Sequence, residues 1–320
     1  MSVSYGPNFG LSRRHVLGGL AGASMVGLPA FAQSLTPGLL KPAFLSHLSF
    51  TVSDLKASAT FYQKLFGFPP LETTTPQNAR TFGFYFGERL NRFLSLTPPR
   101  AGDKPGRITH YCISCDNFSP TKDGKRLTDA GFAGVRIIDT DVDQWITLPD
   151  FDKNVLQIFE SKYLAKCPTC MPPPGGSSMP PPANALFKAR SISHIGQTVA
   201  DIKRTKDFYQ KVFALPENLR SVAPASAPAY ALDFNGEFVS LTPKSSNPDA
   251  RDYYGIAVDN FDAQRDGKRL VDAGFKDVQV VSNEKNVAQF VTVPDPDGLV
   301  IRISDAKYIY DCATCKAPPL

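Results

Sequence analysis

The stretch FLSHLSFTVSDLKASATFYQKLFGF, residues 44–68, decides the fold because a near copy, SISHIGQTVADIKRTKDFYQKVFAL, follows at residues 191–215. In each copy an alternating apolar segment carries one histidine, His47 or His194, and apolar residues at helical spacing follow it. Alternation with a period of two predicts a strand, and spacing of three and four predicts a helix. The chain therefore contains the same strand–helix unit twice, each with a histidine on its first strand.

The repeat extends over whole domains. DGKRLTDAGF, which starts at Asp123, recurs as DGKRLVDAGF from Asp266, and CPTC in the first half recurs as CATC in the second. Between the halves, MPPPGGSSMPPPANA is too rich in Pro, Gly and Ser for regular structure. We expect a first domain at 44–170, a linker at 171–187 and a second domain at 188–316.

Each domain divides again into two units with the same pattern. After the first helix, ARTFGFYFG and NRFLSLTP return to strand alternation. The rest of the domain then repeats strand, short helix and strands, from RITHYCISC to NVLQIFE. We therefore predict an α+β fold in which four βαβββ modules pair into two domains.

These features resemble one known family. Paired βαβββ modules, a histidine on a first strand, FYQKLFGF on the helix and a DPDG turn at 295–298 resemble the vicinal oxygen chelate superfamily. That superfamily includes glyoxalases, fosfomycin- and bleomycin-resistance proteins, and extradiol ring-cleaving dioxygenases. The resemblance implies two open β-barrel-like domains, in each of which two modules curl around a concave face that can hold a metal.

The resemblance also implies a metal site in the first domain. His47 and His110 lie on the first strands of its two modules and Glu160 ends its last strand, which matches the family's ligand positions. Two imidazoles and one carboxylate leave open positions on a metal for water, substrate or O₂. The alternative interpretation makes the histidines hydrogen-bonded residues inside the barrel and Glu160 a solvated strand end.

The expected metal and chemistry follow from the same resemblance. The strand RFLSLTP offers Ser95 or Thr97 but no carboxylate, so the fourth ligand of a glyoxalase-type site is missing. This favours Fe²⁺, with Mn²⁺, Ni²⁺ or Zn²⁺ as other ions, and an extradiol-type dioxygenase acting on a catechol-like substrate with vicinal oxygens. The alternatives are a lyase or isomerase of glyoxalase or fosfomycin-resistance type, and a non-catalytic small-molecule binding protein. The catalytic residues stay unassigned, because the first domain has no further histidine to act as acid or base.

The second domain departs from this pattern. His194 is kept, but Tyr253 stands in place of His110 and Asp305 in place of Glu160. One imidazole with two oxygen donors is a poorer match for Fe²⁺ or Zn²⁺. We expect a degenerate copy that supports the first domain or lines a ligand pocket of its own.

The N-terminal segment predicts export. Arg13 and Arg14 precede a Gly-rich apolar run that ends in an A-x-A pattern at Ala30 and Ala32. This resembles a twin-arginine signal peptide over residues 1–32, cleaved after Ala32, and implies the twin-arginine export machinery as partner and a periplasmic or secreted product. A membrane anchor is the alternative. The formal net charge of +5 is too small to indicate a nucleic-acid partner.

Six cysteines form three C-x-x-C pairs. Cys112 and Cys115 lie on a predicted strand with side chains on opposite faces, so we expect buried free thiols. The other two pairs each follow the last strand of a domain, and we expect structural disulfides there, with a shared Cys₄ zinc site as the alternative. These pairs are Cys167/Cys170 and Cys312/Cys315.

Overall fold

The computed structural model describes residues 38–68, 70–74, 80–86, 92–140, 144–162, 184–215, 217–218, 230–234, 236–244, 252–282 and 289–305. All of them belong to one compact unit, Leu35–Leu320. The predicted signal peptide, most of the predicted linker and the two outer cysteine pairs lie outside these residues. Within the described ranges, no helix has the length and apolar character needed to cross a membrane.

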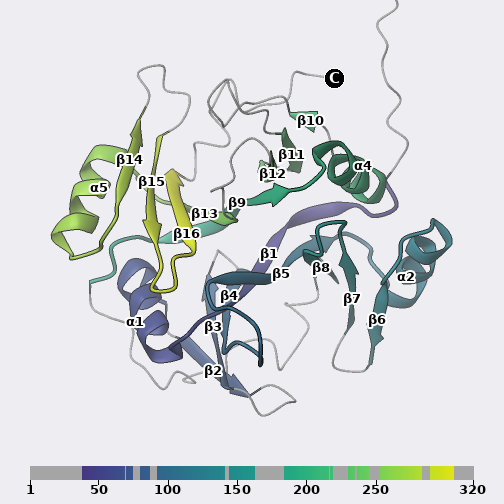
Figure 1. Cartoon of the computed structure of the whole chain (residues 1–320), viewed down its shortest axis with the longest axis horizontal. Coiled ribbons are helices and arrows are strands. Elements are labelled where there is room, and N and C mark those ends of the chain that lie inside the picture. Colours follow the sequence, from purple (N-terminus) through teal and green to yellow (C-terminus); the bar gives the residue numbers. More distant parts are fainter. Residues whose placement is uncertain are drawn as a thin grey trace, which may run out of the picture. The chain divides into compact units, whose positions relative to one another are not determined.

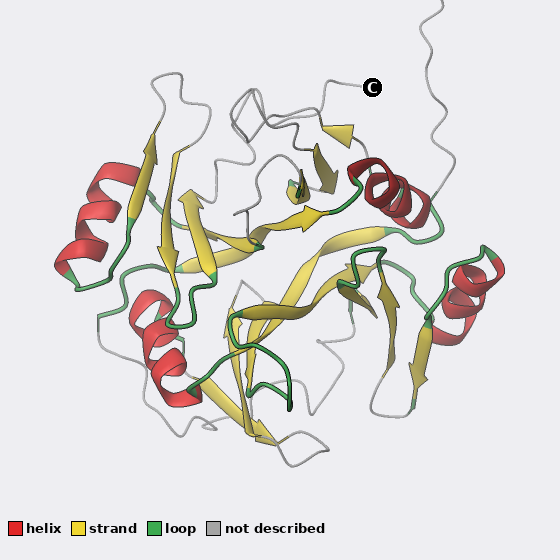
Figure 2. Cartoon of the chain, viewed as in Figure 1, coloured by secondary structure: helices red, strands yellow, loops and turns green. Residues whose placement is uncertain are grey.

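Two eight-stranded sheets form the framework (Figure 1). The strands of the first sheet are β1 (Pro42–Thr51), β2 (Pro70–Thr74), β3 (Arg80–Phe86), β4 (Arg92–Thr97), β5 (Arg107–Cys115), β6 (Arg136–Asp139), β7 (Gln144–Pro149) and β8 (Val155–Glu160). The strands of the second are β9 (Ala189–Val199), β10 (Glu217–Asn218), β11 (Tyr230–Phe234), β12 (Glu237–Pro243), β13 (Tyr253–Val258), β14 (Gln279–Ser282), β15 (Gln289–Pro294) and β16 (Val300–Asp305). The helices of the described part lie beside the sheets (Figure 2). They are α1 (Leu55–Phe66), α2 (Pro120–Asp129), α4 (Ile202–Phe213) and α5 (Ala263–Asp272).

Each sheet joins two modules through a central antiparallel pair. The orders are β2-β3-β4-β1-β5-β8-β7-β6 and β10-β11-β12-β9-β13-β16-β15-β14, so β1 meets β5 and β9 meets β13. The last strand of each module runs parallel to the first strand of the same module. This connectivity gives four βαβββ modules and confirms the predicted α+β fold with two open, barrel-like domains.

The helix of the repeated stretch has clear boundaries in both copies. The Asp54 carboxylate accepts two backbone N–H groups of the first turn of α1, which makes Asp54 rather than Ser53 the N-cap. Gly67 ends α1 with a positive φ of 70°, where a residue without Cβ is favoured. Asp201 caps α4 by accepting the backbone N–H of Arg204, and Ala214 ends this helix at a φ of 49°.

A buried polar network links α1 to the second domain. The Tyr62 hydroxyl donates to Asp295 Oδ2 and accepts from the Tyr254 hydroxyl, both at 3.0 Å. All three residues are buried. Because the partners lie in the other domain, the tyrosine of FYQK holds the two domains together as well as filling the core.

The same network recurs with the domains exchanged. Tyr209 of α4 hydrogen-bonds to Tyr111 and donates to Asp150 at 3.4 Å, and Gln197 contacts both tyrosine hydroxyls at 3.1 Å. Each of these groups is buried. A polar network inside a core is favourable when its members satisfy one another, and here that condition is met twice.

The lysine of FYQK makes a second repeated contact between the domains. Lys64 donates to the carbonyl of Ala273, at the C-terminal end of α5, and Lys211 donates to Ala130 at the end of α2 (2.8 Å). Each ammonium also lies over a phenylalanine ring: Lys64 Nζ is 5.2 Å from the Phe275 ring centroid, and Lys211 Nζ is 5.0 Å from that of Phe132. A cation at a helix C-terminus is favourable because it faces the exposed carbonyls.

The segments that precede β1 and β9 close the ends of the opposite helices. Leu40 donates its N–H to the carbonyl of Val212, and Phe187 donates to Leu65, both at 2.8 Å. Phe187, the last residue of the predicted linker, is buried. The end of that linker is therefore part of the packed structure.

One pair of equivalent positions meets across the interface. Arg92, at the start of β4, forms a largely buried ion pair with Glu237, at the start of β12, and Glu237 also accepts the N–H of Leu45. Burial raises the pKa of Glu237 to about 7, more than the Arg92 guanidinium lowers it. The two copies carry opposite charges where their equivalent strand ends come together.

Candidate ligand-binding faces of the two sheets

His47 lies in a row of side chains that crosses the first sheet. The register pairs Tyr85 with Phe93, Phe93 with His47, His47 with Cys112, and Cys112 with Gln157. Residues paired across neighbouring strands point to the same side of a sheet. We call this side of the first sheet the His47 face.

The two histidines of the first domain are neighbours on this face. Their rings stand edge to face with centroids 5.3 Å apart, and His47 Nε2 lies 3.0 Å from Gln157 Oε1. Burial, and then the nearby His110, lower the pKa of His47 well below its usual value; burial lowers the pKa of His110 to about 4. Both rings are therefore neutral at pH 7, and the Nε2–H of His47 donates to the Gln157 amide oxygen.

Glu160 is not on the His47 face. It follows Gln157 by three positions on β8, so the alternation of the strand turns its side chain to the opposite side. There its carboxylate accepts the backbone N–H of Phe118 at 2.6 Å, in the segment that leads into α2. The expected ligand trio is thus not brought together: His47 and His110 meet, and Gln157 takes the place expected for Glu160.

Aromatic rings extend the His47 face on both sides. Phe93 stacks on the His47 ring at 4.3 Å, and Tyr85 stacks on Phe93 at 5.1 Å. On the other side Phe159 packs against His47 at 5.6 Å, and Trp145 lies 5.4 Å from Phe159. All four of these side chains are partly exposed. The result is an accessible run of rings with His110 and Gln157 as its polar groups.

The donors on this face do not fit the iron site that the resemblance implies. A ligating histidine must turn a nitrogen lone pair toward the metal, whereas Nε2 of His47 lies 3.0 Å from Gln157 Oε1, an atom that can only accept a hydrogen bond. A carboxylate, the usual third ligand of such Fe²⁺ sites, is replaced by a neutral amide. In the described ranges, no three His, Cys, Asp or Glu residues are grouped to hold a metal ion. The charge of a divalent ion would have no compensation from these side chains.

The second sheet carries an equivalent row with different chemistry. Its register pairs Phe238 with His194, His194 with Gly255, and Gly255 with Arg302. We call this side the His194 face. Arg302 therefore occupies the position that Gln157 has in the first domain, and Gly255 occupies that of Cys112.

The His194 face is tightly built around its histidine. The His194 ring stacks on Phe238 with centroids 4.6 Å apart, and its Nδ1 lies 2.9 Å from the Ser193 hydroxyl. A Cβ on Gly255 would lie 2.2 Å from the His194 ring, so only glycine leaves room for that ring position. Burial, and then the positive charge of Arg302, lower the pKa of His194 well below its usual value.

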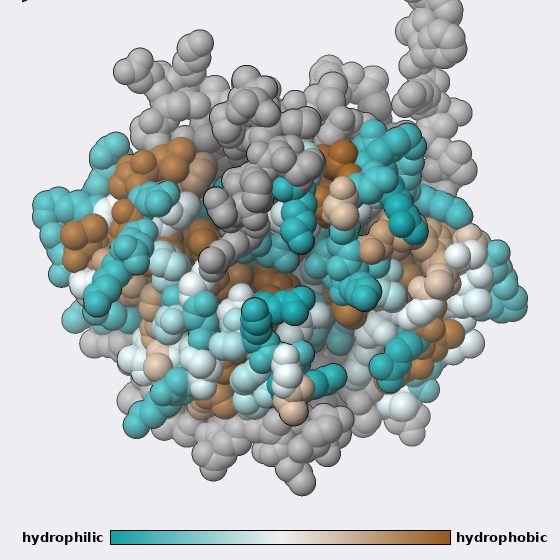
Figure 3. Space-filling model, viewed as in Figure 1, coloured by the Kyte–Doolittle hydropathy of each residue, from teal (hydrophilic) through white to brown (hydrophobic). Residues whose placement is uncertain are grey.

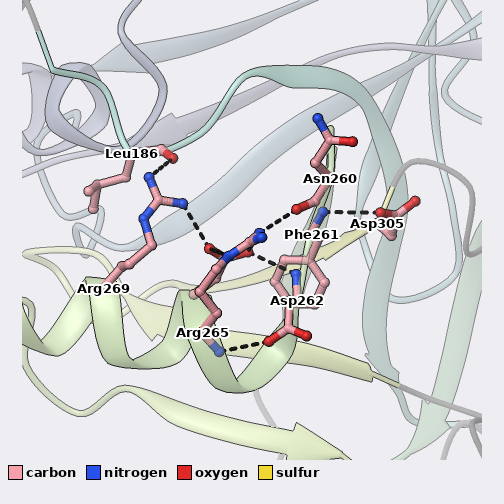
Figure 4. Close-up of polar contacts among 8 residues, drawn as sticks. Leu186, Asn260, Phe261, Asp262, Arg265, Arg269 and Asp305 are labelled. Carbon is pink, nitrogen blue, oxygen red and sulfur yellow. Dashed lines mark hydrogen bonds and ion pairs between the residues drawn. The ribbon is translucent and has the colours of Figure 1, made fainter.

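Asp305 is absent from this face, as Glu160 is from the other. Its carboxylate accepts the backbone N–H of Phe261 at 3.1 Å, next to the N-cap Asp262 of α5 (Figure 4). The expected second-domain trio is therefore also not brought together, since His194 and Tyr253 meet at 5.5 Å and Asp305 points elsewhere. Glu160 and Asp305 perform the same structural task, which is to fix the chain ahead of a helix.

Gln157 and Arg302 are the site residues that sequence reasoning missed. The signal was available in the strand alternation. Leu156 and Ile158 are buried on one side of β8, which assigns Gln157 to the other side, together with Phe159. Glu160 and Asp305 were predicted as ligands instead, because a carboxylate at the end of the last strand is the ligand type that the family resemblance implies.

The two inner cysteines are buried free thiols, as predicted. Cys112 belongs to the row on the His47 face, and burial raises its pKa far above the usual value. Cys115 lies on the other side of β5 and borders a cavity of about 450 Å³, which also includes Gly38 and Asp116. No residue of the His47 face lines that cavity. Thiols with raised pKa are poor nucleophiles, so neither is a candidate catalytic group.

On the face drawn in Figure 3, the described residues form no large continuous apolar area. Hydrophobic side chains form small separated areas among hydrophilic ones in the described part (Figure 3). Large apolar side chains that are exposed come from separate elements: Ile137, Phe151, Val271 and Val280. Scattered apolar residues are normal on a protein surface and need no partner.

Family comparison agrees with the fold. Residues 44–148 and 191–303 match the model of the Glyoxalase/Bleomycin resistance protein/Dioxygenase superfamily. The chain belongs to this superfamily. No curated protein sequence matches significantly.

Solved structures to which this chain is similar include ring-cleaving dioxygenases. The 2,2',3-trihydroxybiphenyl 1,2-dioxygenase of Sphingomonas wittichii strain RW1 superposes with a TM-score of 0.59 at 15% identity, covering 82% of this chain and 90% of that one. A catechol 2,3-dioxygenase gives 0.58 at 16% identity, with 82% and 88% covered. The homoprotocatechuate 2,3-dioxygenase of Arthrobacter globiformis gives 0.54 at 12% identity, with 84% and 81% covered. At this identity the likeness establishes the two-domain fold and not the reaction.

Proposed function

We propose that the first domain binds a planar aromatic small molecule on the His47 face, without a metal ion. The observation that carries this proposal is the run of partly exposed rings around His47, with the His47–Gln157 hydrogen bond in its centre. Flat aromatic surfaces bind flat aromatic ligands through stacking and burial of apolar area. Among the functions expected from the sequence, this is the small-molecule binding protein.

Polar groups on the same face favour a ligand with neighbouring oxygens. The neutral His110 ring and the Gln157 amide each offer hydrogen-bonding atoms beside the aromatic rings. A catechol-like ligand could stack on the rings and place its two hydroxyl groups against these side chains. The ligand class is thus close to the one that the superfamily resemblance implies, but it is held by hydrogen bonds and stacking.

The single tryptophan of the chain, Trp145, is a built-in reporter for this site. We expect catechol or 2,3-dihydroxybiphenyl to change its fluorescence saturably in metal-free buffer containing a chelator. Phe93→Ala and Gln157→Ala should each weaken that binding by about tenfold, since each removes a contact on the order of 1–1.5 kcal/mol. Phe238→Ala, the equivalent change in the second domain, is the matched control and should leave the affinity unchanged. Unchanged affinity in both first-domain variants would refute the proposal.

Iron-dependent ring cleavage is the second candidate, because several solved structures similar to this chain are named as extradiol or catechol dioxygenases. The donor set argues against it, and against a metal-dependent lyase or isomerase, for the same reason: Gln157 stands where a carboxylate is needed. Oxygen uptake by the Fe²⁺-treated protein with catechol decides the matter. Stoichiometric turnover would establish the dioxygenase and displace the binding role.

Export remains part of the proposal. The twin-arginine pattern of residues 1–32 supports a periplasmic or secreted protein. Replacing Arg13 and Arg14 by Lys should leave the chain in the cytoplasm, as cell fractionation would measure. Unaltered export of the double variant would contradict a twin-arginine route.

A further inference from the structure

We propose that the His194 face of the second domain binds a small organic carboxylate through Arg302. This goes beyond the proposed function, since it concerns the other domain, another ligand charge and other residues. The first-domain site can fail while this one stands, and the reverse also holds.

Among the residues that the structure describes, no carboxylate forms an ion pair with the Arg302 guanidinium. Its Cζ lies 3.6 Å from the centroid of the Tyr253 ring and 4.9 Å from that of Phe290. Other partly buried arginines of the described ranges pair with carboxylates, as Arg190 does with Asp259 and Arg269 with Asp266. The two aromatic rings therefore hold a cation in place without neutralising it.

Two nitrogen atoms of this face are buried and lack hydrogen-bond partners. One is Nε of Arg302 and the other is Nε2 of His194, whose side chain is 7% exposed. When the Ser193 hydroxyl donates to Nδ1 of His194, the proton of the neutral ring lies on Nε2. Leaving buried donors unpaired costs free energy that a bound acceptor would recover.

The backbone of the second sheet is shaped for these side chains. Glycine at 255 lets the His194 ring lie across β13, and glycine at 196 does the same for Tyr253, since a Cβ there would be 2.0 Å from its ring. Both glycines replace larger residues of the first domain, Cys112 and Ser49. The His194 face is thus a rebuilt site with a cation, a ring N–H and aromatic walls.

This chemistry selects a carboxylate. A planar guanidinium held between rings presents its remaining N–H groups at a fixed edge, which suits the two oxygens of a carboxylate. A metal ion is disfavoured by the fixed positive charge beside His194. A neutral ligand of the same shape could not form the charge-assisted hydrogen bonds.

Calorimetric titration with benzoate and with the neutral isostere benzamide tests the proposal. The full-length protein should bind benzoate and not benzamide. Arg302→Gln should weaken benzoate binding by about tenfold or more. Arg136→Gln, at an exposed arginine of β6, is the matched control and should bind benzoate like the wild type.

Two further readouts keep the outcome decisive. Circular dichroism checks that Arg302→Gln is folded. If it is not, Arg302→Lys replaces it in the test; this variant keeps the charge and should bind benzoate with an affinity below that of the wild type. Benzoate binding that survives Arg302→Gln, equals benzamide binding, or is absent from the wild type would overturn the proposal. Binding that quenches Trp145 and needs Gln157 would place benzoate on the His47 face, and would also overturn it.

Discussion

The His47 face and the His194 face occupy the same place in two copies of one domain, yet they differ in the residue that sets their chemistry. Each has a histidine stacked on a phenylalanine, Phe93 or Phe238. The last residue of the row, on the closing strand of the domain, is Gln157 in one copy and Arg302 in the other. Neither provides a carboxylate, and only the second provides a charge. The shared histidine therefore reflects common ancestry, and the last strand of each domain distinguishes the two sites.

Residues that hold the domains together have changed far less. The Tyr62–Tyr254–Asp295 network has its counterpart in Tyr209–Tyr111–Asp150. These groups are buried, and losing one member would leave the others unpaired. The repeated FYQK motif therefore indicates how the domains pack, whereas the two ligand-binding faces differ in the row of side chains that contains the histidine.

The largest expected effect comes from the position at which the two copies carry opposite charges. Arg92→Met should lower the free energy of unfolding by about 3–5 kcal/mol, because it leaves Glu237 buried without its cation. Urea unfolding at pH 8 measures this, and Arg92→Met with Glu237→Leu should regain most of the loss. A single variant as stable as the wild type would mean that the pair does not join the domains.

The pH dependence of stability tests the same position. Since the pKa of Glu237 is raised to about 7 in the folded protein, its favourable contribution is complete below its unfolded value near 4.5 and is lost as pH rises through about 7. The wild type should therefore lose up to about 3 kcal/mol relative to Glu237→Gln between pH 5 and 8. Parallel pH profiles of the two proteins would show that this carboxyl group is not perturbed.

Cysteine, the residue that the first domain has at position 112, should destabilise the protein when it replaces Gly255 on the His194 face. Gly255→Cys puts a Cβ 2.2 Å from the His194 ring and should lower the free energy of unfolding by about 1–3 kcal/mol through overpacking. His194→Ala in the same chain should relieve the clash, as urea unfolding of the double variant would detect. An additive loss in the double variant would place the strain elsewhere.

The smallest effect concerns the two carboxylates that were expected to bind metal. Glu160→Gln and Asp305→Asn should each cost about 1 kcal/mol of stability, because each removes a charge-assisted hydrogen bond to a backbone N–H ahead of a helix. Thermal unfolding gives the two values. Similar losses with unchanged ligand binding would support a structural role, and loss of ligand binding in either would assign it to a site.

Sequence periodicity predicted the fold well because its signals are local and repeated. The spacing of apolar residues predicts the helix over 55–66 and the strand that carries His47. The same pattern recurs in the second copy, so the sequence supports each prediction twice. The short strand β2 was missed, because PLETT has no apolar alternation. The contact between Tyr62 and Asp295 was also beyond local pattern, since it depends on how two domains pack.

The sequence predicted only part of the candidate site, namely its two histidines. His47 and His110 were expected to meet, and they do, because central strands of paired modules are adjacent. Glu160 was chosen by residue type, whereas a shift of three along a strand reverses the face. Gln157 is not a usual metal ligand in a sequence; strand alternation alone assigns its face, and its hydrogen bond to His47 identifies its role there.

Titration of the wild type, Gln157→Glu and Glu160→Gln with Zn²⁺ and, under anaerobic conditions, with Fe²⁺ tests directly whether the His47 face lacks a metal site. We expect no tightly bound metal in the wild type or in Glu160→Gln, and about one tightly bound ion per chain in Gln157→Glu, since that change completes a 2-His-1-carboxylate set on the His47 face. One equivalent of tightly bound iron in the wild type that is lost in Glu160→Gln would contradict it.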